Sequence, residues 1–493
     1  MKLNICRSVY LNGKKNLSRS YFICMKSFYL RDIYLSLFVL LTAGCTKTTT
    51  TTTNTATIPV VLTTSTIINV ISTSAQSGGT VIHTGNAAIS ANGVCYSSVN
   101  TTPTTADSKT VDPVESNTTQ YPAFTSNLSK LTPNTTYYIR AYAVNSAGTG
   151  YGSVIKFTTS SSLTAITATV TTFAGNGASG YVDASGLSAQ FNNPQGVTVD
   201  SKGNIYVSDT YNNIIREITP AGVVSTVAGM PTLGYTDGPP ATAQFYAPVG
   251  SAFDTQGNLY VADFGNNVIR KITPAGVVST YAGNGTAGYR NGAATAANLT
   301  GKTDTLAFFN NPQAVAVDAL GNVYVADRGN NVIRKILPTG RVVTMAGTRT
   351  AGYTDATNEQ ASFSSPSGVA VDAAGNVYVS DQGNSAIRKI TPADVVSTIA
   401  SGTSLLNLPS ALTVDKTGNL YIVDEGGRIF EYTTSNVLYN LAGTSNTSGL
   451  VNGLGTSVLF SNPQGIAIDA NGNIYVADQY NNCIRKITIT LVQ

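Results

Sequence analysis

The sequence predicts an all-β protein assembled from many short strands. Of its 493 residues only 11% are charged, and 46 glycines and 26 tyrosines contrast with a complete lack of tryptophan. β-branched and aromatic side chains suit a pleated sheet, while Gly and Asn suit the tight turns that join strands. One sequence pattern also recurs from residue 165 to the end of the chain. This composition excludes a disordered chain and a basic nucleic-acid-binding tail.

The charge is unevenly distributed along the chain. The formal net charge is +4, but residues 1–44 hold seven Lys or Arg and one Asp, which leaves 22 basic and 24 acidic residues from Cys45 onward. The chain without this segment is therefore close to neutral, at −2. A nucleic-acid-binding surface needs clustered basic side chains, and this part of the chain offers little material for one.

The N-terminal segment predicts export. Residues 26–45 read KSFYLRDIYLSLFVLLTAGC, a short charged stretch followed by an uncharged apolar run over residues 33–43. This run is shorter than the roughly 20 residues that span a bilayer, and it has the length of a signal-peptide core. We therefore expect a signal peptide that ends at residue 44, with Met25 as its true start.

The end of this segment, residues 41–45 (LTAGC), resembles the lipobox of bacterial lipoproteins. The resemblance implies that the Cys45 thiol is acylated and becomes the mature N-terminus, anchored in the cell envelope by several acyl chains. Thr46 follows Cys45 in place of Asp, which by the same resemblance favours the outer membrane. The alternative is an ordinary cleaved secretory signal with a coincidental cysteine. Residues 45–57, rich in Thr, are expected to form an unpacked tether.

The remaining cysteines form no disulfide framework. Cys95 and Cys483 fall in different predicted domains, so a bridge between them is not expected. Cys483 occupies the position that Val268 and Val332 take in equivalent repeats. We therefore interpret it as a small buried hydrophobic residue.

Residues 58–160 have the size and turn spacing of a β-sandwich with about seven strands. A tyrosine that follows the Leu-x-Pro turn at residues 131–133 resembles a tyrosine corner, and the whole segment resembles fibronectin type III-like domains of secreted bacterial proteins. The resemblance implies a spacer. His83, the single histidine of the chain, is expected at the surface, since no second His or Cys pair accompanies it as a metal ligand.

Residues 165–493 repeat the pattern FxxPxGVxVDxxGNxYVxDxxNNxIRKIxPxGVVSTxAG. Its proline recurs at spacings of 54, 64, 54, 43 and 54 residues. A period of this length with four strand-like runs per repeat is typical of the blades of a β-propeller. The six prolines are Pro194, Pro248, Pro312, Pro366, Pro409 and Pro463.

The sixth repeat lacks its outermost strand. The missing VSTxAG ending has its counterpart before the first repeat, at residues 168–175 (ATVTTFAG). We therefore expect this N-terminal strand to complete the last blade, which closes a six-bladed propeller without an unpaired edge.

The motifs GVAVD, GNxYVAD and NNxIRKI resemble NHL repeats, and the resemblance covers about two thirds of the chain. Together with the resemblance of residues 58–160 and the count of six repeats, it predicts an all-β chain in which a fibronectin type III-like β-sandwich precedes a six-bladed, NHL-type β-propeller. Propeller topology then places the loops after the second strand of each repeat and the connections between repeats on one face.

The first candidate feature of that face is an aspartate at the end of the second strand of every repeat. Because the same residue recurs six times, we interpret it as structural, with its carboxylate accepting N–H groups of its own loop. These aspartates are Asp209, Asp263, Asp327, Asp381, Asp424 and Asp478. Five repeated arginines are expected to cover strand surface and to bridge blades: Arg216, Arg270, Arg334, Arg388 and Arg485.

The second feature is a Gly-Tyr pair in four connections between repeats. Tyr combines apolar area with a polar tip, so these side chains are candidate ligand contacts, against the alternative that they only pack over the blade edge. The fifth repeat lacks the pair, because its connection at residues 402–407 is short and its aspartate loop has no Asn pair. The tyrosines, expected as a crescent open at the fifth repeat, are Tyr181, Tyr235, Tyr289 and Tyr353.

Three classes of function remain from the sequence. A binding or scaffold protein for a glycan, peptide or protein leads, without cofactor or metal. An enzyme of the lactonase or lyase type is the alternative; residues 165–493 contain no histidine, which excludes a His-ligated zinc site and a Ser-His-Asp triad but leaves an Asp/Asn-ligated calcium site open. RNA binding, known for some animal NHL propellers, ranks last. We expect contact with the membrane through the lipid anchor alone.

Overall fold

The computed structural model describes residues 55–114, 123–160, 165–298, 305–402 and 405–492. Within these ranges the secondary structure consists of β-strands and short 3-10 turns, without an α-helix. The described residues include no helix of the length and hydropathy needed to cross a bilayer. The signal peptide, the start at Met25, the lipidated Cys45 and most of the Thr-rich tether lie outside the described residues.

The first domain consists of two antiparallel sheets. One sheet contains β1 (Val60–Thr63), β2 (Ile67–Ile68), β3 (Ser74–His83) and β6 (Ala123–Ser129). Its strand β2 also pairs in parallel with β31 (Val437–Ala442), so this sheet continues into strands from later in the chain. The other contains β4 (Ala91–Ser97), β5 (Ser108–Lys109), β7 (Thr136–Asn145), β8 (Gly148–Tyr151) and β9 (Ile155–Thr158).

The core of this domain includes Leu128, Ile139 and Phe157. The Tyr137 hydroxyl accepts a hydrogen bond from the backbone N–H of Thr132 at 3.0 Å, five residues upstream, which is the arrangement expected of a tyrosine corner. His83 is exposed at the end of β3, as predicted.

The rest of the chain forms antiparallel sheets that we number as repeats 1 to 6. Repeats 1 and 2 consist of β11 (Gly196–Val199), β12 (Ile205–Asp209), β13 (Ile214–Ile218) and β14 (Val224–Ala228), then β15 (Pro248–Phe253), β16 (Leu259–Asp263), β17 (Val268–Ile272) and β18 (Val278–Ala282). Repeats 3 and 4 consist of β20 (Pro312–Val317), β21 (Val323–Asp327), β22 (Val332–Ile336) and β23 (Arg341–Ala346), then β24 (Pro366–Val371), β25 (Val377–Asp381), β26 (Ala386–Ile390) and β27 (Val396–Ser401).

Repeats 5 and 6 complete the series. They consist of β28 (Pro409–Val414), β29 (Leu420–Asp424), β30 (Arg428–Tyr432) and β31 (Val437–Ala442), then β33 (Pro463–Ile468), β34 (Ile474–Asp478) and β35 (Cys483–Val492) with β10 (Ala165–Ala174). Two short strands, β19 (Gly292–Ala293) and β32 (Gly453–Leu454), pair with β23 and β10.

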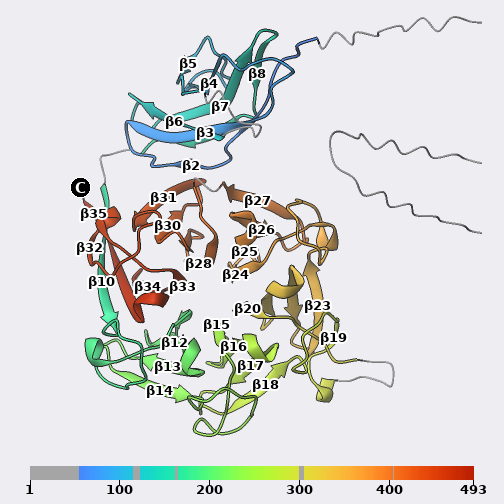
Figure 1. The fold of residues 1–493 in the computed structure, drawn as a ribbon, viewed down its shortest axis with the longest axis vertical. Helices are drawn as coiled ribbons and strands as arrows, with labels where there is room; N and C mark the ends of the chain where they lie inside the picture. The colour runs from blue at the N-terminus through green and yellow to red at the C-terminus, as the bar shows by residue number, and fades with distance from the viewer. Residues whose placement is uncertain (1–54, 115–122, 161–164, 299–304, 403–404, 493) are drawn as a thin grey trace, which may run out of the picture. The chain divides into compact units, whose positions relative to one another are not determined.

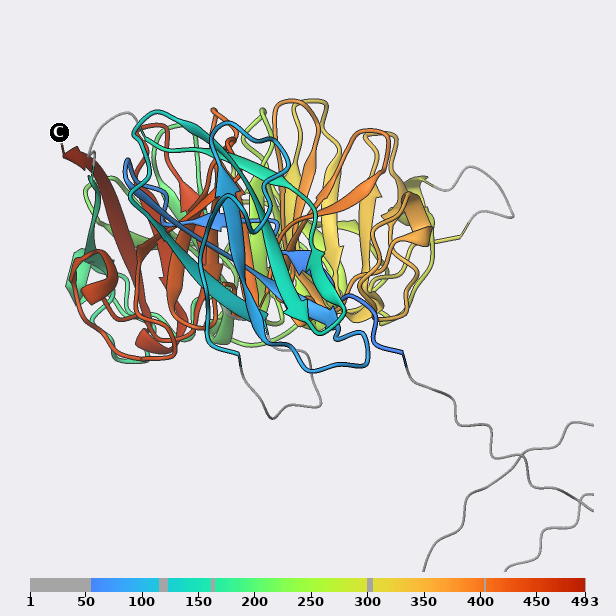
Figure 2. The same cartoon turned by 90° about the horizontal axis from the view of Figure 1, so that it is seen from above.

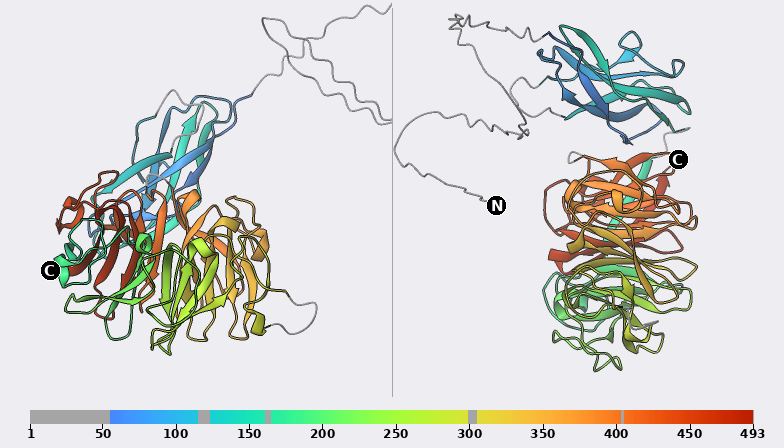
Figure 3. Two further views of the ribbon diagram at one scale, coloured as in Figure 1. Left: turned by 60° about the horizontal axis from the view of Figure 1, so that its bottom comes forward. Right: turned by 90° about the vertical axis from the view of Figure 1, so that its right-hand side faces the viewer.

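The innermost strands β11, β15, β20, β24, β28 and β33 contact one another in this order, and β33 contacts β11. The sheets therefore follow each other around a central axis (Figure 1), and the views from the side show their strands running along that axis (Figures 2 and 3). Glycine is required where these strands approach most closely, because a Cβ on Gly196 would lie 1.9 Å from the backbone oxygen of Val249. A larger residue there would push two neighbouring repeats apart.

The strand before repeat 1 pairs with the last strand of the chain. The register of β10 on β35 runs from Ala165 opposite Val492 to Ala174 opposite Ile484. The predicted pairing of the N-terminal strand with the sixth repeat is therefore present. Val170 in β10 is fully buried, so this strand also contributes to the core.

The core lies between neighbouring sheets. One cluster joins Val207 and Phe191 of repeat 1 to Tyr475 and Ile484 of repeat 6. Phe191 stands at the first position of the repeated FxxP motif, and its counterparts in four other repeats are also buried: Phe245, Phe309, Phe363 and Phe460. Cys483 is completely buried as a free thiol, as predicted, and burial raises its pKa far above the ordinary value.

Candidate functional site

The six repeated aspartates are buried and hold the incoming connection of their own repeat. In repeat 2, the Asp263 Oδ1 accepts the backbone N–H of Tyr246 at 2.8 Å. Its Oδ2 accepts the Asn266 Nδ2 at 2.9 Å and the Arg270 Nη1 at 2.8 Å. All six side chains are fully buried. The structural interpretation therefore agrees with the geometry, although the backbone donor comes from the connection 17 residues earlier and not, as predicted, from the aspartate's own loop.

The repeated arginine completes this arrangement. Arg270 is fully buried and donates to the backbone oxygens of Gln244 and Thr236, and its Nη2 lies 2.7 Å from the Asp237 Oδ1. These partners lie in the connection that leads into repeat 2. The prediction that the guanidinium bridges two blades was therefore wrong, because the described partners of these arginines lie in their own repeat and its incoming connection.

Burial also perturbs the aspartates electrostatically. Loss of solvent raises the pKa of Asp209 to about 6, against the opposing effects of its Asn and Arg partners. The pKa of Asp263 is raised for the same reason. A carboxylate that is fully buried and occupied by three donors is unsuited to contact a ligand, so the geometry favours a structural role for these residues.

The Asn pair of the motif has two separate roles. The Asn266 Nδ2 also donates to the backbone oxygen of Gly234 at 2.7 Å, which joins the loop after the second strand to the Gly-Tyr connection. Asn267 adopts a left-handed conformation with φ of 56°, which Asn tolerates better than most residues. Its side chain accepts the backbone N–H of Asn311 in the next connection at 2.9 Å. The Asn pair thus fixes the loop after the second strand and the connections between repeats on one face.

Repeat 5 reaches the same result by a different route. Phe430 stands opposite Asn440, where the other repeats carry the buried arginine. Arg428, two residues earlier, contacts the Asp424 carboxylate at 2.6 Å instead. The repeated motif does not predict that Arg428 replaces the repeated arginine, because the motif has no arginine at the position of Arg428.

The predicted tyrosines lie over their repeated arginines. The Arg270 Cζ lies 5.3 Å from the centre of the Tyr235 ring, and the Tyr235 hydroxyl is 3.1 Å from the Thr280 Oγ1 of the outer strand β18. Tyr235 remains 44% exposed. Tyr181, Tyr289 and Tyr353 lie over their arginines in the same way, at 5.3, 5.0 and 5.2 Å.

Three of the four tyrosines therefore contact the outer strand of their own repeat, and no contact among the four is present in the described structure. Their hydroxyls are fixed in three repeats, on Thr226, Thr280 and Thr344. Their rings keep an exposed face. The four tyrosines therefore pack against their own repeats and still have an exposed ring face that a ligand could contact. We call these four side chains the tyrosine rim.

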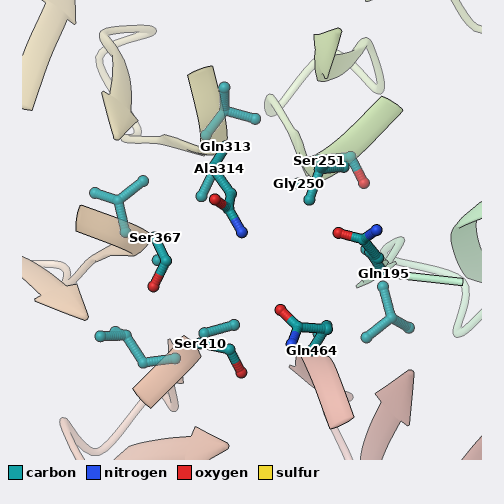
Figure 4. A pocket seen from close by; sticks show the side chains of 17 residues that line it. Gln195, Gly250, Ser251, Gln313, Ala314, Ser367, Ser410 and Gln464 are labelled. Carbon is teal, nitrogen blue, oxygen red and sulfur yellow. The ribbon is translucent and has the colours of Figure 1, made fainter. Parts of the chain in front are cut away.

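A narrow channel lies at the centre of the ring. It encloses a cavity of about 70 Å³ lined by the first residues of the innermost strands. This volume matches a few water molecules and is too small for a sugar ring or a peptide. Three carboxamides, those of Gln195, Gln313 and Gln464, are directed into it (Figure 4).

The residue that follows each repeated aspartate differs from repeat to repeat. Hydrogen bonds join side chains at this position to the channel. The Glu425 Oε1 accepts the Gln382 Nε2 at 2.7 Å and the Nε2 of Gln464, a residue that lines the channel, at 3.3 Å. We call this set the channel mouth, and it consists of Thr210, Phe264, Arg328, Gln382, Glu425 and Gln479.

The repeated motif does not predict the channel mouth, because the motif contains only the residues that the repeats share. The sequence signal for the channel mouth is variation at a fixed position. Directly after the aspartate that all six repeats share, five different residue types occur, and only Gln occurs twice. Among the described residues, no group of three or more His, Cys, Asp or Glu side chains lies close enough to hold a metal ion.

A protein-family model described as NHL repeat matches residues 191–216, 309–336, 363–390 and 460–487. The chain therefore contains NHL repeats in repeats 1, 3, 4 and 6, and the resemblance stated from the motifs is confirmed for these segments. The all-β character and the propeller arrangement agree with this match.

Similar proteins include the chloroplastic protein SUPPRESSOR OF QUENCHING 1 of Arabidopsis thaliana, which is 28% identical over 331 residues, or 64% of this chain. The chain spans about a quarter of that relative, 26% of its length. A crystal structure of a protein of unknown function from Bacteroides thetaiotaomicron aligns with 88% of this chain and 98% of its own, at a TM-score of 0.49 and 17% identity. A gluconolactonase from Xanthomonas campestris aligns with 61% of this chain and 87% of its own, at a TM-score of 0.43 and 15% identity.

Proposed function

We propose that this chain is a binding lipoprotein of the bacterial cell envelope and not an enzyme. In this proposal Cys45 carries the lipid, residues 46–57 are the tether, and a fibronectin type III-like domain spaces a six-bladed propeller away from the membrane. The propeller face that carries the connections between repeats binds a glycan, peptide or protein.

Two observations support the proposed architecture. The cyclic contact order of the innermost strands, from β11 through β33 and back to β11, is what a ring of six blades requires. The two-sheet arrangement of the first domain and the Tyr137 to Thr132 bond are typical of an immunoglobulin-like sandwich.

The observation that carries the binding function is the division of labour on this face. The repeated residues Asp263, Asn266 and Arg270 form a rigid buried support. The side chains displayed around this support differ between repeats, at the channel mouth and in the length of the connections. Loops held by a rigid scaffold are where proteins usually place binding.

The experiment is a screen of the purified chain on glycan and peptide arrays, followed by the double variant Tyr235→Ala with Tyr289→Ala. Aromatic contacts are worth about 0.5 to 1.5 kcal/mol each beyond burial, so the double variant should weaken binding by roughly tenfold. Its free energy of unfolding should change by about 1 kcal/mol at most, because both rings are partly exposed.

Unchanged affinity of the double variant would exclude the tyrosine rim as a ligand contact. A large loss of stability would instead favour a packing role for the tyrosines. Turnover of a lactone by the purified chain, abolished by calcium chelation, would contradict the non-enzymatic proposal.

A further inference from the structure

A chain of hydrogen bonds crosses repeats 3 to 6 at the channel mouth. The Arg328 Nη2 donates to the Gln382 Oε1 at 3.0 Å, and the Gln382 Nε2 donates to the Glu425 Oε1 at 2.7 Å. The Gln464 Nε2 reaches the same Glu425 oxygen at 3.3 Å. None of these side chains is part of the repeated support. Gln464 has counterparts in Gln195 and Gln313, but the linked set of Arg328, Gln382 and Glu425 occurs once in the ring. The repeated support therefore does not account for it.

The other side of the mouth is aromatic. Tyr480 of repeat 6 and Tyr211 of repeat 1 are 61% and 60% exposed, and Tyr246 of repeat 2 is 44% exposed. Tyr211 and Tyr480 stand two residues after their aspartates. Repeats 6, 1 and 2 are consecutive around the ring, because β33 contacts β11 and β11 contacts β15. Three neighbouring repeats therefore each present one exposed tyrosine.

The same backbone hydrogen bond holds Tyr211 and Tyr480 in place. The N–H of Tyr211 donates to the Asn192 oxygen and that of Tyr480 to the Ser461 oxygen. In repeats 2, 3 and 4 the equivalent donors are glycines, Gly265, Gly329 and Gly383, and repeat 5 has Gly426 in its shortened loop. In repeat 2 the acceptor is the Tyr246 oxygen, so its tyrosine comes from the incoming connection. Repeats 3, 4 and 5 therefore carry no side chain at this position. Of the polar chain in these repeats, Arg328 and Glu425 are partly exposed, whereas Gln382 is buried.

Several polar groups on the polar side lack a partner in the described structure. The Arg328 Nε is buried without a hydrogen bond. The Gln313 Oε1 is also unpartnered, although Gln313 is only 9% exposed and is directed into the channel (Figure 4). Buried polar groups without partners are costly, so each calls for a water molecule or a ligand group.

We propose that the channel mouth and the exposed tyrosines of repeats 6, 1 and 2 together bind a neutral oligosaccharide, with the tyrosines under the sugar rings and the side chains of Arg328 and Glu425 on the hydroxyls. This inference rests on the proposed binding function and assigns its ligand class and site. The cavity of about 70 Å³ is too small for a sugar ring, so the ligand lies across the mouth.

The chemistry of the mouth favours a sugar over other ligands. A pyranose ring offers C–H groups to an aromatic face and hydroxyls that both donate and accept at its edge. A carboxylate beside a guanidinium matches such hydroxyls, because together they supply both acceptors and donors. The mouth carries one Arg and one Glu, so it has no net charge to select a phosphate or a nucleic acid.

The test is isothermal titration of the full chain with soluble glucan, xylan and mannan hexasaccharides and with a panel of hexapeptides. At least one oligosaccharide should bind. The Tyr211→Ala with Tyr480→Ala double variant and the Glu425→Gln variant should each weaken it by about tenfold, with melting temperatures unchanged. Leu320→Ala is the matched surface control, since this residue is 80% exposed in the turn between β20 and β21, at the opposite end of the strands, and should bind like the parent.

Each other outcome overturns the proposal. Oligosaccharide binding that survives in the mouth variants but is lost in Tyr235→Ala with Tyr289→Ala would move the site to the outer rim and leave the proposed function standing. Binding of peptides alone would overturn the ligand class and leave a binding protein. If neither the oligosaccharides nor the peptides bind at millimolar concentration, the result would overturn both this inference and the proposal that the propeller face binds a glycan or a peptide.

Discussion

At the scale of single residues, the repeated polar side chains of the motif build the scaffold. Asp263 and Arg270 are buried completely, and each satisfies the other together with backbone groups of the incoming connection. A buried pair of this kind adds little net stability compared with apolar residues, but removal of one partner leaves a charge without compensation. The pair therefore fixes where the connection runs.

Two aspartates contact the Arg270 guanidinium, and their substitution should lower the free energy of unfolding by unequal amounts. Asp263→Asn should lower the free energy of unfolding by about 3 kcal/mol, because it removes a fully buried countercharge of Arg270. Asp237→Asn should cost less than about 1 kcal/mol, since Asp237 is 49% exposed and repeats 3 and 6 already use Asn291 and Asn452 there. Urea denaturation of the two variants measures the difference. Equal losses would contradict the assignment of Asp263 as the structural partner.

At the scale of elements, the strands were predictable and the contacts of the connections were not. The sequence predicted four strand-like runs per repeat, and repeat 1 has four strands, of which β13 spans Ile214–Ile218. Local alternation and turn residues define such strands. The donor to Asp263 comes from Tyr246, 17 residues away, and the partner that replaces the missing arginine of repeat 5 is Arg428. Neither follows from a local period, because both depend on how the chain returns to its own sheet.

The pairing of β10 with β35 leads to a prediction about the N-terminal strand. A chain that starts at residue 177 lacks β10 and exposes the edge of β35, whereas one that starts at residue 163 keeps it. The lost backbone hydrogen bonds are worth about 0.5 to 1.5 kcal/mol each, and Val170 leaves the core as well. Together these losses approach a typical stability margin of about 5 to 15 kcal/mol. Calorimetry should show a much lower melting temperature for the shorter chain; equal values would exclude the role of β10.

At the scale of the whole molecule, the repeats allow the architecture to be predicted from the sequence, but they give no indication of the proposed site at the channel mouth. Six similar segments point to one kind of blade, so departures from the pattern were treated as variation. The Arg328, Gln382 and Glu425 chain joins three different repeats, each of which contributes one residue that fits no motif. Such a site exists only when the ring brings the repeats together, which is why the tyrosines of the connections were predicted and the channel mouth was not.

The last prediction concerns how the whole molecule is held in the envelope. Metabolic labelling with a palmitate analogue should mark the wild-type chain and leave Cys45→Ala unlabelled, because the LTAGC sequence offers one acceptor thiol after small residues. Acyl chains contribute about 0.8 kcal/mol per buried CH₂, so more than one chain gives stable anchoring. The same substitution should therefore move the protein from the membrane fraction to the soluble fraction. Label on the Cys45→Ala protein would place the anchor elsewhere, and a wild-type chain without label would favour an ordinary cleaved signal.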